Sequence, residues 1–148
     1  MGLIKYTTRI KDFNATPRET VPGERVKISG YLQFYNWTKF PPGWEGLDGH
    51  KVKILVDNEV VREVYTAEEG FFETYHTFES VGEYVLKAVY EGTHTPVYQW
   101  EPAESREILV RIVSKEEWEK RSLYALVIGG GIMLSILGLV YLSVRRRG

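Results

Sequence analysis

The stretch Val26-Lys-Ile-Ser-Gly-Tyr-Leu-Gln-Phe34 indicates the fold class most clearly. Apolar residues and one glycine occupy every second position, and polar side chains or tyrosine stand between them. Because side chains alternate between the two faces of a β-strand, this pattern predicts a strand with one buried and one solvent-facing side. Similar alternation recurs over 52–56, 84–90 and 108–112. The chain is therefore predicted to carry an all-β domain.

Turn residues separate these runs from three further predicted strands. The additional strands lie near 5–10, over 60–66 and from Phe72 to Phe78, with breaks at 57–59 and 68–70. No helical period appears between the strands. About seven short strands in roughly 110 residues predict an antiparallel β-sandwich.

A second feature is the uncharged, apolar stretch over residues 123–144. A helix of this length measures about 33 Å, which is enough to cross roughly 30 Å of hydrocarbon. Tyr124 and Tyr141 lie near its ends, where aromatic side chains commonly anchor a helix at the membrane surface. We therefore predict one transmembrane helix in contact with the lipid bilayer, rather than a helix buried in the domain core.

Basic residues flank this predicted helix on both sides. Arg145, Arg146 and Arg147 follow it, so the positive-inside rule places the C-terminus in the cytoplasm. The 115–122 flank carries an equal number of basic residues, and the N-terminus shows no apolar signal sequence. Two readings stay open: a signal peptide has been removed, or the protein is tail-anchored with a cytosolic head. We expect the first, a single-pass cell-membrane protein with an extracytoplasmic head.

Small residues form a stripe on the predicted membrane helix. Gly131, Ser135 and Gly138 are spaced so that a helix places them on one face. Such a face allows close approach of a second helix, so these residues are candidates for self-association or for docking on a partner helix. The alternative is an accident of composition, because glycine is common in membrane helices.

Several segments together resemble prokaryotic (bacterial or archaeal) Ig-like domains. The similar segments are Val21–Gly30, Leu47–Asp57, Gly70–Phe72, Gly82–Gly92 and Ser105–Val113. The resemblance implies an Ig-like β-sandwich of a cell-surface protein without catalysis. It also implies a tyrosine corner at Tyr84, near the start of a strand. The chain carries one copy, whereas such domains often occur as tandem repeats.

The expected organisation has four parts. These are an Ig-like sandwich over 1–114, a polar juxtamembrane stalk of helix-favouring residues over 115–122, the membrane helix over 123–144, and a basic cytoplasmic tail over 145–148.

The sequence offers no site for catalysis, a metal or a cofactor. The chain has no Cys, and its three His and three Asp are scattered without metal-ligand spacing. His76 is in phase with Phe72 and Phe78 and is predicted to be a partly buried core histidine. Residues 1–122 hold 16 basic and 20 acidic residues, a net charge of −4, which argues against nucleic-acid binding. We therefore expect a protein that is not an enzyme.

Two predicted long loops, 36–49 and 92–105, carry the candidate binding residues. These are the aromatic side chains Trp37, Phe40, Trp44, Tyr98 and Trp100. Exposed aromatic residues flanked by polar ones are typical of protein-binding or glycan-binding surfaces. The alternatives are that the loops bury their own aromatic rings, or that the rings touch lipid headgroups or a partner subunit. The main expectation is recognition, or service as an accessory subunit of a surface or membrane complex; the alternative is a structural spacer or the terminal repeat of a larger surface protein.

Two triplets match the acceptor pattern for N-glycosylation. Asn14-Ala-Thr16 and Asn36-Trp-Thr38 both have a middle residue other than proline. Both are consistent with an extracytoplasmic head and are candidate modification sites at Asn14 and Asn36.

Overall fold

The computed structural model describes residues 3–121. The chain divides into two compact units, residues 1–112 and 113–148. The predicted membrane segment 123–144, the tail 145–148 and the small residues Gly131, Ser135 and Gly138 lie outside the described residues. Within residues 3–121, no helix has the length and apolar character needed to cross a membrane.

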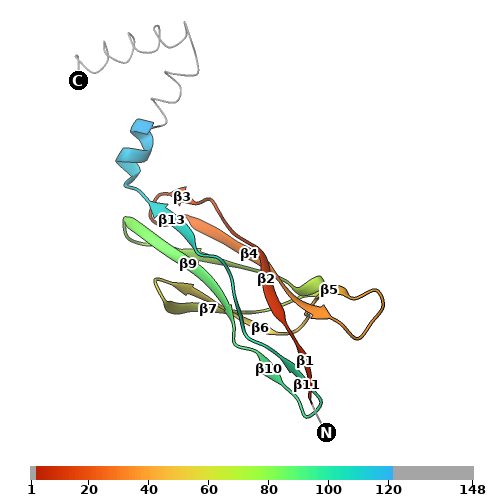
Figure 1. Ribbon diagram of the computed structural model, residues 1–148. Coiled ribbons are helices and arrows are strands. Elements are labelled where there is room, and N and C mark those ends of the chain that lie inside the picture. The colour runs from red at the N-terminus through yellow and green to blue at the C-terminus, as the bar shows by residue number, and fades with distance from the viewer. Residues whose placement is uncertain (1–2, 122–148) are drawn as a thin grey trace, which may run out of the picture. The chain divides into compact units, whose positions relative to one another are not determined.

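The first unit is built from two main sheets and one small sheet (Figure 1). The first main sheet contains β2 (Thr8–Thr16), β4 (Arg25–Asn36), β5 (Gly43–Gly46) and β8 (Phe71–Thr77). The second contains β3 (Glu19–Thr20), β13 (Ile108–Ile112), β9 (Gly82–Tyr90), β6 (Lys51–Val56), β7 (Glu59–Tyr65) and β12 (Ala103–Glu104). The small sheet contains β1 (Ile4–Tyr6), β11 (Tyr98–Trp100) and β10 (Thr93–His94).

The strand order identifies the fold as an Ig-like β-sandwich. β2, β4 and β8 are neighbours in one sheet, while β13, β9, β6 and β7 follow one another in the other. The first, second and fifth of the long strands thus face the third, fourth, sixth and seventh. This is an Ig-like arrangement in which the fourth strand lies with the third, sixth and seventh, whereas constant-type Ig domains place it in the other sheet. The short strand β3 adds to β13 in parallel. The seven predicted strands and the predicted sandwich are confirmed.

The hydrophobic core lies between the inner faces of the two main sheets. It contains Phe13, Val26, Ile28, Leu32, Val52, Ile54, Phe72, Leu86, Ala88, Tyr90, Ile108, Val110 and Ile112, all nearly inaccessible to solvent. Gly30 faces Phe72 across the β4–β8 pair. A Cβ atom at Gly30 would lie 2.6 Å from Cζ of Phe72, so the ring packs against the main chain only because this residue is glycine.

The two segments predicted to be long loops contain strands. Residues 36–49 form a hairpin that returns as β5 and pairs with the end of β4. Residues 92–105 contain β10, β11 and β12, and β11 pairs in parallel with β1 near the N-terminus. β1, β10 and β11 lie together at one end of the sandwich (Figure 1). Their short strands lack the alternation that marks the longer ones.

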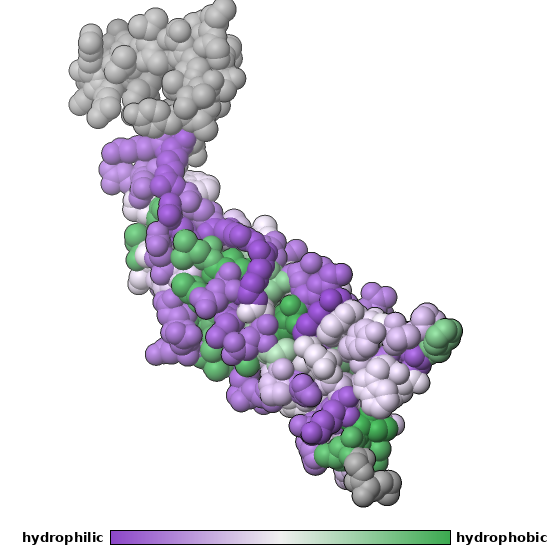
Figure 2. Space-filling view, in the orientation of Figure 1, coloured by the Kyte–Doolittle hydropathy of each residue, from purple (hydrophilic) through white to green (hydrophobic). Residues whose placement is uncertain are grey.

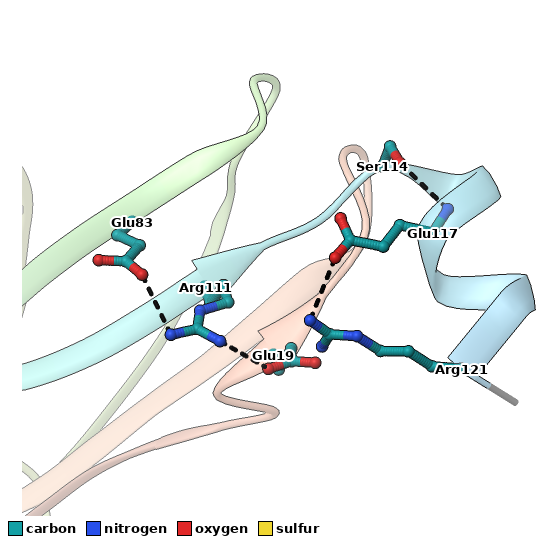
Figure 3. A network of polar contacts seen from close by, with 6 residues as sticks. All are labelled: Glu19, Glu83, Arg111, Ser114, Glu117 and Arg121. Carbon is teal, nitrogen blue, oxygen red and sulfur yellow. Dashed lines mark hydrogen bonds and ion pairs between the residues drawn. The ribbon is translucent and has the colours of Figure 1, made fainter. Parts of the chain in front are cut away.

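The described part of the second unit is a helix over residues 115–121. Ser114 caps its start, because the main-chain N–H of Glu117 donates to Oγ of Ser114 at 3.1 Å. Arg121 contacts the Glu117 carboxylate at 3.1 Å, one helical turn apart (Figure 3). These residues are helical, as their composition predicts.

Candidate binding surface

Four aromatic side chains converge at the end of the sandwich formed by the small sheet. We name this group, Tyr6, Trp37, Tyr98 and Trp100, the aromatic pole. The ring of Tyr6 is buried, and its centroid lies 6.4 Å from Trp37, 6.1 Å from Tyr98 and 6.0 Å from Trp100. Tyr6 also packs edge-on against Phe34 of β4, at 5.1 Å. It therefore connects the two aromatic segments to the core.

Main-chain pairing holds the aromatic pole together. In the parallel β1–β11 pair, Tyr6 stands opposite Trp100 and Ile4 stands opposite Tyr98. The N–H of Glu101 donates to the carbonyl of Tyr6 at 2.9 Å, and the Thr8 hydroxyl donates to the carbonyl of Glu101 at 2.5 Å. These contacts fix the position of β11 relative to the main sheet.

Trp37 combines a fixed position with wide exposure. Its indole Nε1–H donates to the carbonyl of Lys5 at 2.9 Å. This bond satisfies a carbonyl on the strand β1, which lies at the edge of the small sheet. The side chain is nevertheless 55% exposed. Trp37 is therefore an exposed aromatic side chain whose position is fixed by a hydrogen bond.

A polar cluster of His50, Tyr90 and Thr93 supports Trp100 from the sandwich side. The His50 ring lies 5.1 Å from the Trp100 ring, and its Nδ1 lies 2.8 Å from the Tyr90 hydroxyl and 3.2 Å from that of Thr93. The Tyr90 hydroxyl donates to the Thr93 hydroxyl at 2.9 Å. Burial lowers the pKa of His50 and raises the pKa of Tyr90. Both groups are therefore neutral at pH 7.

Trp44 lies apart from the aromatic pole, on the outer face of the first sheet. Its ring lies 5.4 Å from that of Tyr35, its partner across the β4–β5 pair. The guanidinium of Arg9 sits 4.0 Å from the Trp44 ring centroid, a cation–π contact. Arg9 Nε also donates to the amide oxygen of Gln33 at 2.8 Å. Trp44 thus belongs to a surface built from β2, β4 and β5.

Phe40 lies between β4 and β5 and is 96% exposed. The hairpin that carries it is braced by Glu45, which pairs with Lys39 at 2.6 Å and accepts from the Asn36 amide at 3.0 Å. Hydrogen bonding to Lys39 and then to Asn36 lowers the pKa of Glu45. The braced hairpin presents Phe40 to solvent.

The five predicted contact residues therefore separate into three places. Trp37, Tyr98 and Trp100 meet at the aromatic pole, Trp44 lies on the sheet face and Phe40 lies in the hairpin. Trp100 is half-buried, so it partly fits the alternative in which the loops bury their own aromatic rings. The other four residues are exposed to solvent. Tyr6 was absent from the predicted set because nothing in its local sequence separates it from other strand residues.

The aromatic pole and the chain exit lie at opposite ends of the sandwich. Ile112 pairs with Gly82 at the start of β9, whereas Tyr90 at the end of β9 leads into β10. A nine-residue strand is about 27 Å long. Figure 2 shows hydrophobic side chains gathered at the end formed by β1, β10 and β11.

The two candidate glycosylation sites differ in their surroundings. Asn36 opens a turn in which its side-chain oxygen accepts from the Thr38 N–H at 3.1 Å and from the Thr38 hydroxyl at 2.5 Å. Asn14 lies in β2, and its side-chain oxygen accepts from Nη2 of Arg18 at 2.7 Å. Modification at both sites stays a prediction.

The remaining polar side chains show no arrangement for metal binding. Within residues 3–121, no group of three or more His, Asp or Glu side chains is placed to hold a metal ion. His76 is half-buried against Phe78, with ring centroids 4.7 Å apart, and burial lowers its pKa. This matches the predicted core histidine. A shallow open depression beside β10 is lined by Glu91, Gly92, Thr93, His94, Gln99, Trp100 and Pro102.

Comparison with known proteins finds similarity to solved structures alone. No protein-family model and no curated protein sequence matches the chain. The solution NMR structure of a CARDB domain from Pyrococcus furiosus is 18% identical over 76% of this chain and 98% of that one, with a TM-score of 0.47. A crystal structure of that CARDB domain in complex with di-metal ions is 12% identical over 74% of this chain and 94% of that one, with a TM-score of 0.43.

Proposed function

We propose that the chain is a non-enzymatic recognition domain of the cell surface, and that its aromatic pole contacts a protein partner. The observation that carries this proposal is the convergence of Trp37, Tyr98 and Trp100 on the buried ring of Tyr6. Trp and Tyr side chains supply a large share of the energy at protein interfaces, especially where the surrounding structure holds them in place. The hydrogen bond from Trp37 to Lys5 and the β1–β11 pairing provide that support here.

Membrane attachment is the second part of the proposal. Residues 123–144 cross the membrane, the arginine tail is cytoplasmic and the head is extracytoplasmic. The uncharged sequence of this segment supports the span. Because the chain leaves the sandwich at Ile112, the aromatic pole lies at the other end of the domain.

A partner inside the membrane would make the chain an accessory subunit of a larger complex. Gly131, Ser135 and Gly138 form the stripe on which a second helix would pack. This contact is separate from the aromatic pole, so either can exist without the other.

The alternative function is a structural spacer or terminal repeat. A spacer needs a stable sandwich but no exposed aromatic contacts. It therefore predicts that substitutions at the aromatic pole leave every association of the protein unchanged.

The test uses the full-length protein extracted from its native membrane. We expect the double variant Trp37→Ala/Tyr98→Ala to recover at least about tenfold less of its partner than the wild type, because loss of two interface aromatics commonly exceeds 1.4 kcal/mol. The matched control is Leu109→Ala, an exposed apolar residue on β13. Equal recovery by all three proteins would favour the spacer.

Topology is tested by protease added to intact cells or spheroplasts. Digestion of the head with protection of a C-terminal tag is the expected result. Protection of the head with an accessible C-terminal tag would show a tail-anchored protein with a cytosolic head.

A further inference from the structure

The two main sheets differ in how the charges on their outer faces are balanced. On the second sheet, lysine and arginine side chains contact carboxylates: Lys51 with Glu63 at 3.5 Å, Lys53 with Glu91 at 2.5 Å, Lys87 with Glu104 at 3.6 Å, and Arg111 with Glu83 at 3.1 Å and Glu19 at 4.0 Å. Figure 3 shows Arg111 between its two partners. On the first sheet, the outward-facing Arg9, Lys11, Arg25 and Lys27 make no ion pair within residues 3–121. These four cations outnumber the exposed carboxylates of β2, β4 and β8, which are Asp12 and Glu73.

The same face carries five aromatic side chains. We name this set, Tyr31, Tyr35, Trp44, Phe71 and Tyr75, the outer aromatic face. Buried residues alternate with these positions along β4, so the odd-numbered residues of β4 point away from the core. The surface around β5 is pale in Figure 2, as expected for side chains of intermediate hydropathy.

Cross-strand pairing groups these rings at regular intervals. Tyr35 lies 5.4 Å from Trp44, and Tyr31 lies 5.2 Å from Phe71. Tyr75 stands opposite Lys27 in the β4–β8 register. The three positions on β4 are four residues apart, so successive groups lie about 13 Å from each other. Such a row exceeds the reach of a single small molecule and suits an extended linear ligand.

Cations lie directly beside the aromatic groups. Arg9 covers the Trp44 ring at 4.0 Å, and the Arg25 guanidinium lies 4.4 Å from the Tyr75 ring. Lys11 stands opposite Tyr31 across the β2–β4 pair. Each aromatic group thus has a basic side chain as a neighbour, which pairs a ring surface with an anion-binding group.

Other outward side chains of β2 and β4 carry hydroxyl and amide groups. These are Asn14, Thr16, Ser29 and Gln33. The acidic side chains on these strands and on β8 are Asp12, which is exposed beside Lys11 in the irregular part of β2, and Glu73, which accepts a hydrogen bond from the Tyr75 hydroxyl at 2.9 Å. Glu68 and Glu69 border the face beside β5, in the 3-10 turn Glu68–Gly70. The positive charge therefore comes from Arg9 and Lys11 toward one end of the face and from Arg25 and Lys27 toward the other.

We propose that the outer aromatic face binds an acidic linear polysaccharide. Sugar rings stack on the aromatic groups, their hydroxyls bond to the amide and hydroxyl side chains, and their carboxylates or sulfates pair with the free cations. The ligand lies along β4 and spans about 27 Å from Tyr35 to Lys27. This site is separate from the aromatic pole and does not depend on a protein partner there.

Two other polymers fit the face less well. An extended peptide binds a sheet through the unpaired main chain of an edge strand, whereas β4 is paired on both sides. A single-stranded nucleic acid also stacks on aromatic rings, but its binding relies on a dense track of basic residues. The alternating hydroxyl, amide and basic groups of this face match a polyhydroxylated ligand better.

The test measures binding to the full-length protein reconstituted in lipid nanodiscs. The probes are polygalacturonate oligosaccharides, neutral cello-oligosaccharides of the same length and a twenty-nucleotide oligo-dT. We expect the uronic-acid oligosaccharide to bind at least about tenfold more tightly than the neutral one at low salt, and to weaken as salt screens the cations.

Variants locate the site. Lys11→Glu/Lys27→Glu and, separately, Trp44→Ala should each weaken polygalacturonate binding about tenfold or more. The controls are Lys51→Glu/Lys87→Glu and Tyr65→Ala, which make a matching charge change and aromatic loss on the second sheet. Thermal melts confirm that each variant is folded.

Three results would overturn the proposal. They are absence of polygalacturonate binding, equal binding by the face variants and the controls, and face-dependent binding of oligo-dT in place of the glycan. The third would assign the face to nucleic acid. None of these results changes the partner recovery measured with the aromatic-pole variants, so the two proposals fail independently.

Discussion

The hydroxyl of Tyr84 donates a 2.7 Å hydrogen bond to the main-chain carbonyl of Ser80, across the corner that leads into β9. The ring of Tyr84 packs against Phe78 at the same corner, with centroids 4.6 Å apart. The contact joins the turn before β9 to the end of β8 and has the form of the tyrosine corner of Ig-like domains. The role expected of Tyr84 from the resemblance is confirmed.

Tyr84→Phe tests the energetic value of this corner. The change keeps the ring and removes the hydrogen bond, so we expect a loss of about 0.5–1.5 kcal/mol in the free energy of unfolding. Urea denaturation of residues 1–114 measures it. Tyr31→Phe is the control, because the Tyr31 hydroxyl makes no hydrogen bond within the described residues. Equal losses of unfolding free energy in the two variants would show that the Tyr84 hydroxyl stabilises the protein no more than the Tyr31 hydroxyl does.

The register of the second sheet predicts opposite outcomes for two leucines. Leu86 of β9 is fully buried, whereas Leu109 of β13 points outward and is 47% exposed. Leu86→Ala should cost about 2–5 kcal/mol of unfolding free energy because it leaves a cavity. Leu109→Ala should stay within about 0.5 kcal/mol. Similar costs for the two changes, measured by chemical denaturation, would contradict this register.

Tyr6 is expected to control the geometry of the aromatic pole. Tyr6→Ala removes the ring between Trp37, Tyr98 and Trp100, so β1 should separate from β11 and the tryptophans should become more exposed. Intrinsic tryptophan fluorescence should shift to longer wavelength and be quenched more strongly by acrylamide. Tyr6→Phe keeps the ring and should leave the spectrum unchanged. Unchanged fluorescence in Tyr6→Ala would show that the aromatic pole forms without Tyr6.

Acid should destabilise the sandwich through its half-buried histidines, His50 and His76. Burial lowers the pKa of His50 and of His76 below the ordinary value of 6.5. As the pH falls below about 6.5, the histidines of the unfolded chain therefore become protonated before those of the folded protein. This difference lowers the free energy of unfolding until the pH reaches the pKa values of the folded protein. The melting temperature of the wild type should decline between about pH 7 and pH 5. The melting temperature of the double variant His50→Asn/His76→Asn should decline less over the same range. Parallel decline of both proteins would exclude the histidines as the cause.

The long strands could be predicted from sequence because their side-chain alternation is local. Val26, Ile28 and Leu32 face the core in β4, as the alternation over Val26 to Phe34 predicts. The parallel β1–β11 pair could not be predicted in this way. It joins residues 4–6 to 98–100, and neither segment carries a pattern that selects the other.

The candidate sites also combine features that the local sequence predicts with features that depend on pairing between distant segments. The exposed aromatics Trp37 and Phe40 could be chosen from the residues around them, whereas the role of Tyr6 depends on pairing between distant segments. Lys11 and Lys27 look like ordinary strand lysines in the sequence. Neither has a carboxylate partner among residues 3–121, because the register of β2, β4 and β8 places Tyr31 and Tyr75 beside them.

Site-specific photo-crosslinking in intact cells tests whether the aromatic pole contacts a protein partner. A photo-reactive phenylalanine analogue replaces Val97, which is 52% exposed and precedes Tyr98 of the aromatic pole, or Val81, which is 58% exposed in the corner before β9 at the opposite end of the sandwich. We expect one discrete protein adduct from position 97 and none from position 81, and loss of the adduct in Trp37→Ala/Tyr98→Ala. Equal labelling from both positions, or no protein adduct from position 97, would contradict recognition by the aromatic pole.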